Sequence, residues 1–187
     1  MIEHHAVPDA APPLSDAELV RSAVAGEREA FSELVRRHQQ ALYRHARGMG
    51  IAHDTALDLV QDACVRAFVR LRQCRDPERF RPWLFRLFRN LVLDYTRDIR
   101  RREIPLDAVA EQAGRDDITP LELRASLVHA LQALPELLRE AFLLRHVAER
   151  SYEEIAEMTG ARVSAAKMRV HRAREQLRAS LEANGGL

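Results

Sequence analysis

Apolar residues recur every three or four positions along most of the chain, which is the spacing of one face of an α-helix. Long stretches contain neither proline nor glycine and are rich in Ala, Leu, Arg and Glu, the residues that favour helices. Seven glycines and eight prolines supply little turn material for a β fold. The pattern therefore predicts an all-α protein of two small helical domains joined by a flexible acidic linker.

The first predicted domain spans residues 15–102 and follows a disordered tail at residues 1–14. A Ser15–Glu18 capping box opens a short helix that reaches Gly26. Longer helices follow over residues 27–49, 54–72 and 81–102, with Asp54 as the expected N-cap of the third. The inward faces of the second and third helices consist of residues at helical spacing: Phe31, Leu34, Val35, His38, Leu42 and His45, then Ala56, Leu59, Val60, Ala63, Ala67 and Phe68.

A change of composition separates this domain from the second. Residues 103–120 are acidic, contain Pro105, Gly114 and Pro120, and show no sustained periodicity, which predicts a linker. The second domain, residues 121–187, begins with helices over 121–134 and from Pro135 to about residue 146.

The chain ends in two helices with the pattern of a helix-turn-helix. Ser151 and Glu154 form a second capping box, Gly160 is placed to turn the chain, and a longer helix spans about 163–181. Val163, Ala166, Val170, Ala173 and Leu177 form its apolar stripe, and basic residues occupy the opposite face. A helix of this kind can enter the major groove of DNA. The alternative is an ordinary helical hairpin with a solvated basic face.

Charge is strongly segregated, although the net charge is only +1. Residues 66–102 carry twelve arginines against four acids, and residues 161–178 carry six basic residues against one acid. Residues 103–123 carry six acids against one arginine. Two basic blocks around an acidic spacer indicate two contacts with a polyanion, or else two solvated faces.

Other classes of protein find little support in the sequence. No apolar run approaches the roughly 20 residues of a membrane span, and the N-terminus lacks the pattern of a secretory signal. No Gly-rich phosphate loop or nucleophile motif suggests an enzyme. Cys64 and Cys74 have no metal-type spacing, and they are expected to be inert thiols rather than redox sensors. We therefore expect a cytoplasmic protein without enzymatic activity, metal or cofactor.

Four short motifs, in order, give the chain a resemblance to the extracytoplasmic-function (ECF) sigma factors of bacterial RNA polymerase. Residues 56–62, ALDLVQD, resemble the family's "AEDLVQE", and residues 83–94 resemble "WLYRIARN…D". Leu134-Pro135-Glu136 is followed by SYEEIA at residues 151–156. Residues 167–174, KMRVHRAR, resemble "VKSRLxRAR". The resemblance covers about residues 14–181 and implies two domains, regions 2 and 4.

The resemblance implies roles for individual residues of region 2. The positions that would dock on the clamp helices of polymerase are Asp58, Leu59, Gln61 and Asp62. Asn90 would recognise a flipped base of the minus-ten element, because an amide both donates and accepts hydrogen bonds. Arg86, Arg89 and Arg97 would clamp phosphates. Trp83 would either stack at the edge of the duplex or anchor the core, and the core is favoured.

In region 4 the resemblance implies contacts with the duplex minus-thirty-five element. The positions concerned are Arg145, Ser164, Lys167, Met168, Arg169, His171, Arg172 and Arg174. Core RNA polymerase, promoter DNA and an anti-sigma factor are the implied partners. Cys74, Phe88, Leu57 and Met168 depart from the common family pattern. Two alternatives remain: a helix-turn-helix regulator that binds DNA alone, and a sigma mimic that occupies an anti-sigma factor.

Overall fold

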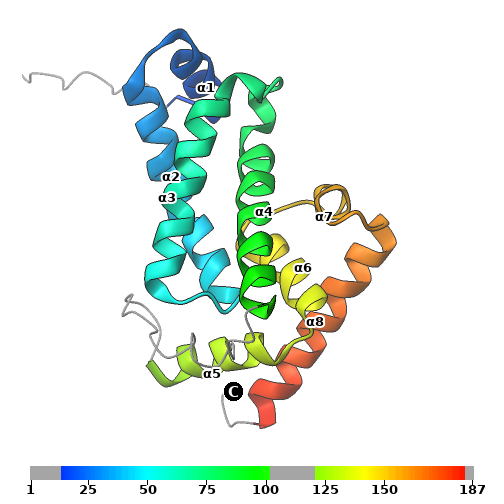
Figure 1. Ribbon diagram of the computed structural model, residues 1–187. Coiled ribbons are helices and arrows are strands. Elements are labelled where there is room, and N and C mark those ends of the chain that lie inside the picture. Colours follow the sequence, from blue (N-terminus) through cyan, green and yellow to red (C-terminus); the bar gives the residue numbers. More distant parts are fainter. Residues whose placement is uncertain (1–13, 102–120, 184–187) are drawn as a thin grey trace, which may run out of the picture.

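The computed structural model describes residues 14–101 and 121–183, and these residues are helical and contain no strand. Figure 1 shows two groups of helices: α1 to α4 form an upright bundle, and α5 to α8 lie below and beside it. Their bounds are α1 Asp16–Ala25, α2 Arg28–Gly48, α3 His53–Arg70, α4 Phe80–Arg101, α5 Leu121–Ala133, α6 Glu136–His146, α7 Tyr152–Thr159 and α8 Val163–Ala183. The predicted all-α class is confirmed.

The helix ends follow from local sequence. The Ser15 side chain accepts a hydrogen bond from the Glu18 amide at 3.3 Å, and the Glu18 carboxylate accepts one from the Ser15 amide at 2.7 Å. The same reciprocal pair forms between Ser151 and Glu154 at the start of α7. Gly160 ends α7 with a φ of 67°, a left-handed conformation that glycine adopts without a steric penalty. Both predicted capping boxes are therefore confirmed.

Two expectations about α3 were wrong. The helix begins at His53 with Ala52 as its N-cap, so Asp54 lies in the first turn, where its charge favours the helix dipole. Phe68 was expected to face the core, but it is 52% exposed and contacts Phe31 only edge to face. The predicted tail, apart from Leu14, and the predicted linker at 103–120 lie outside the described residues.

The core of the N-terminal half, α1 to α4, lies between α2, α3 and α4. Its largest fully buried side chains include three phenylalanines of α4, spaced so that they fall on one face: Phe80, Phe85 and Phe88. Between α3 and α4 the chain forms two short 3-10 helices, Leu71–Gln73 and Pro77–Arg79. The Asp76 side chain caps the second of these by accepting a hydrogen bond from the Glu78 amide. This connection fixes the direction in which α4 leaves α3.

The C-terminal half, α5 to α8, is built around α8. Of the five residues predicted for its apolar stripe, Val163 is partly buried. The other four are buried: Ala166, Val170, Ala173 and Leu177. Helices α5, α6 and α7 all contact α8. The predicted stripe is thus the surface on which the C-terminal half is assembled.

The two halves also contact each other. Leu143 of α6, which is 1% exposed, lies directly against Gly48 at the end of α2. The buried Arg150, in the turn between α6 and α7, places its guanidinium 5.6 Å from the ring centre of Phe85. The buried apolar residues of both halves form one continuous cluster. No helix of the described ranges is long and apolar enough to cross a membrane.

Candidate nucleic-acid interface

Helix α4 carries a polar stripe opposite its buried phenylalanines. Trp83, Arg86, Asn90 and Arg97 recur at spacings of three, four and seven residues, so they share one side of the helix. Arg86, Asn90 and Arg97 are exposed, and Trp83 is half-buried. Trp83 packs against Phe80 with ring centres 5.9 Å apart. The stripe therefore combines exposed groups that can bind DNA with an aromatic ring anchored at its base.

Asn90 lines a pocket between α3 and α4. The pocket has a volume of about 190 Å³. Its lining is Arg66, Arg70, Gln73, Trp83, Arg86, Leu87, Asn90, Leu91 and Asp94. It thus joins one aromatic side chain, three guanidinium groups and the amides of Gln73 and Asn90, the groups that stack on a base, bind phosphates and read a base edge. The sequence reasoning missed Arg66 and Arg70 as site residues, although both were counted in the basic block.

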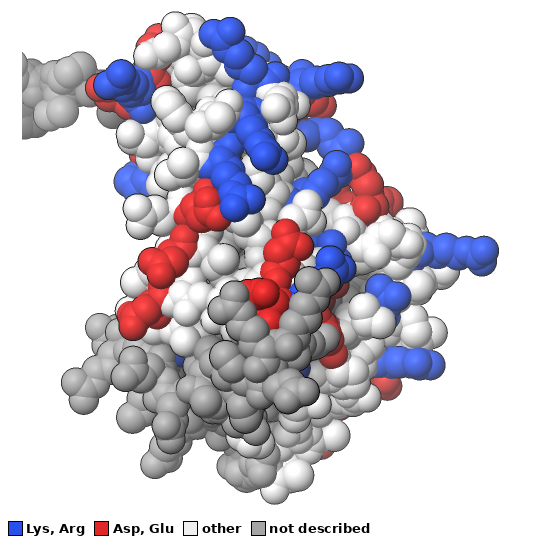
Figure 2. Space-filling view, in the orientation of Figure 1, with Lys and Arg blue, Asp and Glu red and all other residues white. Residues whose placement is uncertain are grey.

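A second pocket, of about 230 Å³, lies on the other side of Trp83 and Arg86. The connection between α3 and α4 forms most of its wall, with Gln73, Cys74, Arg75, Asp76, Arg79 and Pro82. Glu157 of α7 closes one side. In Figure 2 basic side chains gather over the upper part of the molecule, where α3 ends and α4 begins. This end of the bundle is the cationic surface that a polyanion would meet.

Acids of the C-terminal half occupy several of these arginines. Arg89 donates two hydrogen bonds to Glu140 of α6, at 2.6 and 3.2 Å. Arg86 and Arg79 both bind Glu157 of α7, the latter at 3.1 Å. Hydrogen bonds from Arg86 and Arg79 lower the pKa of the Glu157 carboxyl, so it is a carboxylate at neutral pH. Two of the three predicted phosphate clamps, Arg86 and Arg89, are therefore held by carboxylates of the C-terminal half. The third, Arg97, lies 3.9 Å from Asp94 of its own helix.

The helix-turn-helix places the predicted contact residues of α8 on its outer side. Ser164, Lys167, Met168, His171, Arg172 and Arg174 are exposed, and Arg169 is half-buried. His171 lies 3.5 Å from Glu175 on the same helix.

The aromatic ring of Tyr152, the first residue of α7, lies beneath basic side chains near the outer side of α8. Two cations lie over the Tyr152 ring, the Arg145 guanidinium at 5.0 Å and the Lys167 ammonium at 5.7 Å from its centre. Arg145 also donates to the Arg150 carbonyl at 2.9 Å. The sequence reasoning did not single out Tyr152, because a tyrosine in the first turn of a helix carries no signal by itself.

A third surface lies on the outer side of α3. Asp58 and Gln61 are exposed, Asp62 binds Arg66 at 2.9 Å, and Leu59 packs partly buried against the core. The same side carries a row of exposed apolar residues that the sequence reasoning missed: Leu57, Val65, Phe68 and Val69. Val69 is 76% exposed. Apolar groups beside acids and an amide are typical of a protein-binding surface.

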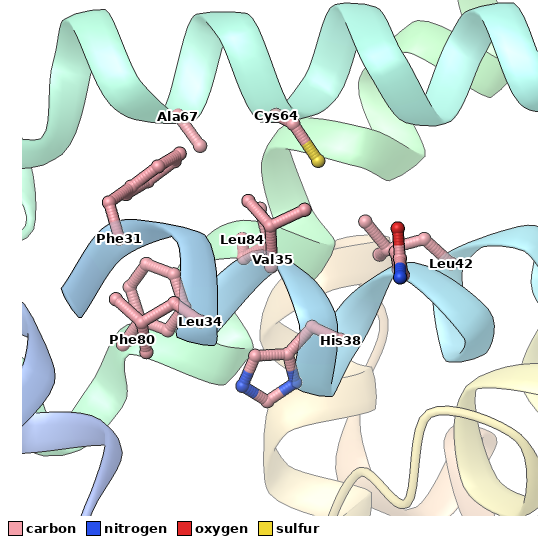
Figure 3. A pocket seen from close by; sticks show the side chains of 10 residues that line it. Phe31, Leu34, Val35, His38, Leu42, Cys64, Ala67, Phe80 and Leu84 are labelled. Carbon is pink, nitrogen blue, oxygen red and sulfur yellow. The ribbon is translucent and has the colours of Figure 1, made fainter. Parts of the chain in front are cut away.

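Neither cysteine is placed for reactivity. Figure 3 shows Cys64 pointing from α3 toward Val35, into a small cavity of about 10 Å³ whose walls are almost wholly apolar. Burial raises the pKa of the Cys64 thiol, and burial and Asp76 raise that of the Cys74 thiol. Both residues therefore stay protonated at neutral pH. The described part of the chain holds no group of three or more His, Cys, Asp or Glu suited to a metal ion.

Comparison with known proteins gives the class of protein to which the chain belongs. The family model described as Sigma-70 region 2 matches residues 34–102, and the one described as Sigma-70, region 4 matches residues 124–177. The α3–α4 pocket thus falls in region 2, and the helix-turn-helix falls in region 4.

Similar individual proteins identify the subfamily of sigma factors. The chain is 39% identical over 158 residues to "ECF RNA polymerase sigma factor SigE" of Mycolicibacterium smegmatis, covering 79% of this chain and 60% of that relative. It is 33% identical to "RNA polymerase sigma factor NccH" of Alcaligenes xylosoxydans xylosoxydans, over 92% of this chain and 97% of the relative. The chain belongs to the ECF sigma factors of RNA polymerase.

One solved structure shows the same fold. The sigma factor RpoE from Bartonella quintana, solved in complex with the anti-sigma factor NepR, matches with a TM-score of 0.66 and 30% identity. The match covers 81% of this chain and 96% of that one. The resemblance seen in the sequence is therefore confirmed.

Proposed function

We propose that this chain is an alternative sigma factor that binds core RNA polymerase, directs it to specific promoters and promotes promoter opening. The observation that carries the proposal is the pocket in region 2 where Asn90 meets Trp83 and three arginines. It acts in transcription initiation as a binding protein rather than an enzyme, and it works in the cytoplasm, where polymerase is.

The outer side of α3 docks on polymerase. Asp58, Gln61 and Asp62 supply the polar contacts with the clamp helices of the largest subunit, and Leu59 holds the helix on its own core. The exposed Val65, Phe68 and Val69 extend this surface toward the end of α3. Burying such apolar groups in the centre of an interface supplies most of the binding free energy.

The α4 stripe reads the melted minus-ten element. An unstacked base enters the pocket beside Asn90, whose amide donates to and accepts from the base edge. Trp83 offers an aromatic wall, so it serves both as a packing residue and as part of the site. Arg86, Arg89 and Arg97 neutralise the phosphates on either side.

Helix α8 reads the duplex minus-thirty-five element from the major groove. Its N-terminal half presents Ser164, Lys167 and Met168, and its middle presents His171 and Arg172. Arg145, Arg169 and Arg174 contact phosphates or support these groups. The segment at 103–120 connects the two readers and passes through polymerase, where its acidic charge suits a basic channel.

An anti-sigma factor regulates the chain and covers its polymerase-binding surfaces until a stress signal releases it. The support is the Bartonella quintana relative, which was solved with the anti-sigma factor NepR.

In-vitro transcription with core RNA polymerase tests the proposal. A library of fragments from the source genome serves as template, and transcript start sites are mapped with and without the purified chain. We expect start sites that depend on both the chain and core polymerase, with shared motifs near minus ten and minus thirty-five. A chain that shifts duplex DNA strongly alone and adds no start sites would instead be a stand-alone regulator.

A further inference from the structure

We infer that the C-terminal half of this chain is an intramolecular blocker of the α4 DNA-binding stripe. In the closed arrangement described here, acids of α6 and α7 take the places that DNA phosphates would occupy on the arginines of α4. The inference rests on the proposed minus-ten role of α4, and it adds a form of regulation that needs no second protein.

The blocking contacts imitate phosphate contacts. Glu140 accepts two hydrogen bonds from Arg89, and two-point recognition of this kind is how arginine binds both carboxylates and phosphates. Glu157 binds Arg86 and Arg79 together and lines the pocket beside Trp83. A DNA strand and these carboxylates therefore compete for the same guanidinium groups.

The contact between the halves extends from the first turns of α4 to the end of α2. Arg81 of α4 binds Glu149 at 2.9 Å in the turn between α6 and α7. Arg150 of the same turn lies against the Phe85 ring. Arg139 of α6 donates to the Met49 carbonyl at 3.3 Å. Figure 1 shows α6 and α7 on one side of α4, and α6 packs against α2.

Much of the contact between the halves is polar, so it can be reversed. Glu157, Arg86 and Arg79 are each about half exposed, and exposed ion pairs contribute little individually. Glu140 and Arg89 are nearly buried, but both regain water when the halves separate. Binding of DNA or polymerase to the open form would therefore shift the population, and the apparent affinity for DNA is reduced by the fraction that is closed.

Gly48 offers a variant that opposes closure by shape rather than by charge. A Cβ atom added at Gly48 would stand 2.5 Å from Leu143 Cδ2 and 2.9 Å from Leu143 Cδ1, and Leu143 is buried. Gly48 closes α2 with an ordinary helical φ, so alanine suits the helix itself. Gly48→Ala should therefore disfavour the closed arrangement and leave α2 intact.

The test uses the full-length protein and three variants: Gly48→Ala, Glu157→Arg and the control Glu182→Arg. Glu182 is an exposed acid of the same half whose partner is Arg178 on its own helix, so its reversal adds the same charge away from α4. Small-angle X-ray scattering gives the radius of gyration. Fluorescence anisotropy gives the affinity for a labelled single-stranded DNA of mixed sequence, and circular dichroism verifies the helix content.

We expect Gly48→Ala and Glu157→Arg to increase the radius of gyration and to bind single-stranded DNA at least about threefold more tightly than the wild type. Glu182→Arg should match the wild type in radius, and its gain in affinity should be smaller. An unchanged radius in both folded test variants overturns the closed arrangement. A larger radius with wild-type affinity overturns the inhibition. If no expanded variant binds DNA at all, the minus-ten assignment under Proposed function fails and the inhibition fails with it.

Discussion

Arg89 of α4 and Glu140 of α6 form a two-point ion pair across the boundary between the two halves, with side chains 15% and 4% exposed. Both charges are removed from water, so each depends on the other for compensation. The pair joins a residue proposed to clamp DNA to a residue with no proposed role in DNA binding. This relationship ties the stability of the molecule to the accessibility of its proposed DNA-binding face.

The first prediction concerns the strength of this pair. Arg89→Ala and Glu140→Ala should each destabilise the protein, and the double variant should lose less than the sum. We expect a coupling free energy of about 1–3 kcal/mol from a double-mutant cycle in urea unfolding. The loss from either single variant is limited by the free energy needed to separate the halves, because separation solvates the remaining charge. Strictly additive losses would contradict the pairing.

The second prediction concerns Asn90, which is exposed and lines the pocket between α3 and α4. Asn90→Ala should reduce the yield of open complexes about tenfold, because the base edge loses both a donor and an acceptor. Stability and core-polymerase affinity should stay near wild type. Permanganate footprinting measures the melted bases, and Gln40→Ala, an exposed amide of α2, is the matched control. Wild-type opening by the Asn90 variant would remove Asn90 from the site.

The third prediction concerns the outer side of α3. Asp62→Arg and Val69→Asp should each weaken binding to core polymerase at least about tenfold, one by charge reversal and one by loss of an apolar contact. Val69 is well exposed and the Asp62 side chain is 43% exposed, so neither change should disturb folding. Surface plasmon resonance with immobilised core enzyme measures the affinity, with Glu29→Arg of α2 as the control. If only Asp62→Arg has an effect, the apolar row is not part of the interface.

The fourth prediction concerns the middle of α8. Arg172→Ala should lower promoter-specific transcription by about five- to one-hundredfold, the range for loss of a specific base contact. Arg178→Ala is the control, because Arg178 lies farther along the same helix and binds Glu182 at 2.7 Å. Run-off transcription from a promoter found in the start-site map gives the readout. Equal losses for both variants would indicate a general charge effect rather than base reading.

The fifth prediction is an acid-sensitive core. His45 is fully buried between Phe85 and Phe88, and its Nδ1 has no hydrogen-bond partner. Burial, helped by the nearby Arg89 charge, lowers the pKa of His45 from 6.5 to about 4. The unfolded chain therefore binds the proton more readily, and stability is lost as the pH falls from about 6.5 toward 4. The loss should amount to about 3 kcal/mol.

Denaturant unfolding at pH 7 and pH 4.5 measures this loss. His45→Leu should be less sensitive to acid than the wild type over that range, because leucine cannot be protonated. His129→Gln, a change at an exposed histidine of α5, should behave as the wild type. An unchanged pH dependence in His45→Leu would show that another group controls acid stability.

The sequence determined the helices and much of the candidate site, because the signals involved are local. The capping boxes at Ser15 and Ser151 each act over three residues. The apolar stripe of α8 lies on one face of a single helix, and no continuous stretch of the family motifs is longer than twelve residues. Helical spacing by itself shows which side chains share a face, and it is enough to group Asn90 with its neighbouring arginines.

The tertiary structure decided what each face meets. Periodicity put Phe68 with the core, yet α2 leaves much of its ring uncovered, so it joins Val69 on an exposed surface. Arg89 and Glu140 are separated by 51 residues, and no local pattern pairs them. Helical periodicity fixes angles around one axis, whereas the burial of Glu140 and the occupation of Arg89 depend on how separate helices pack together.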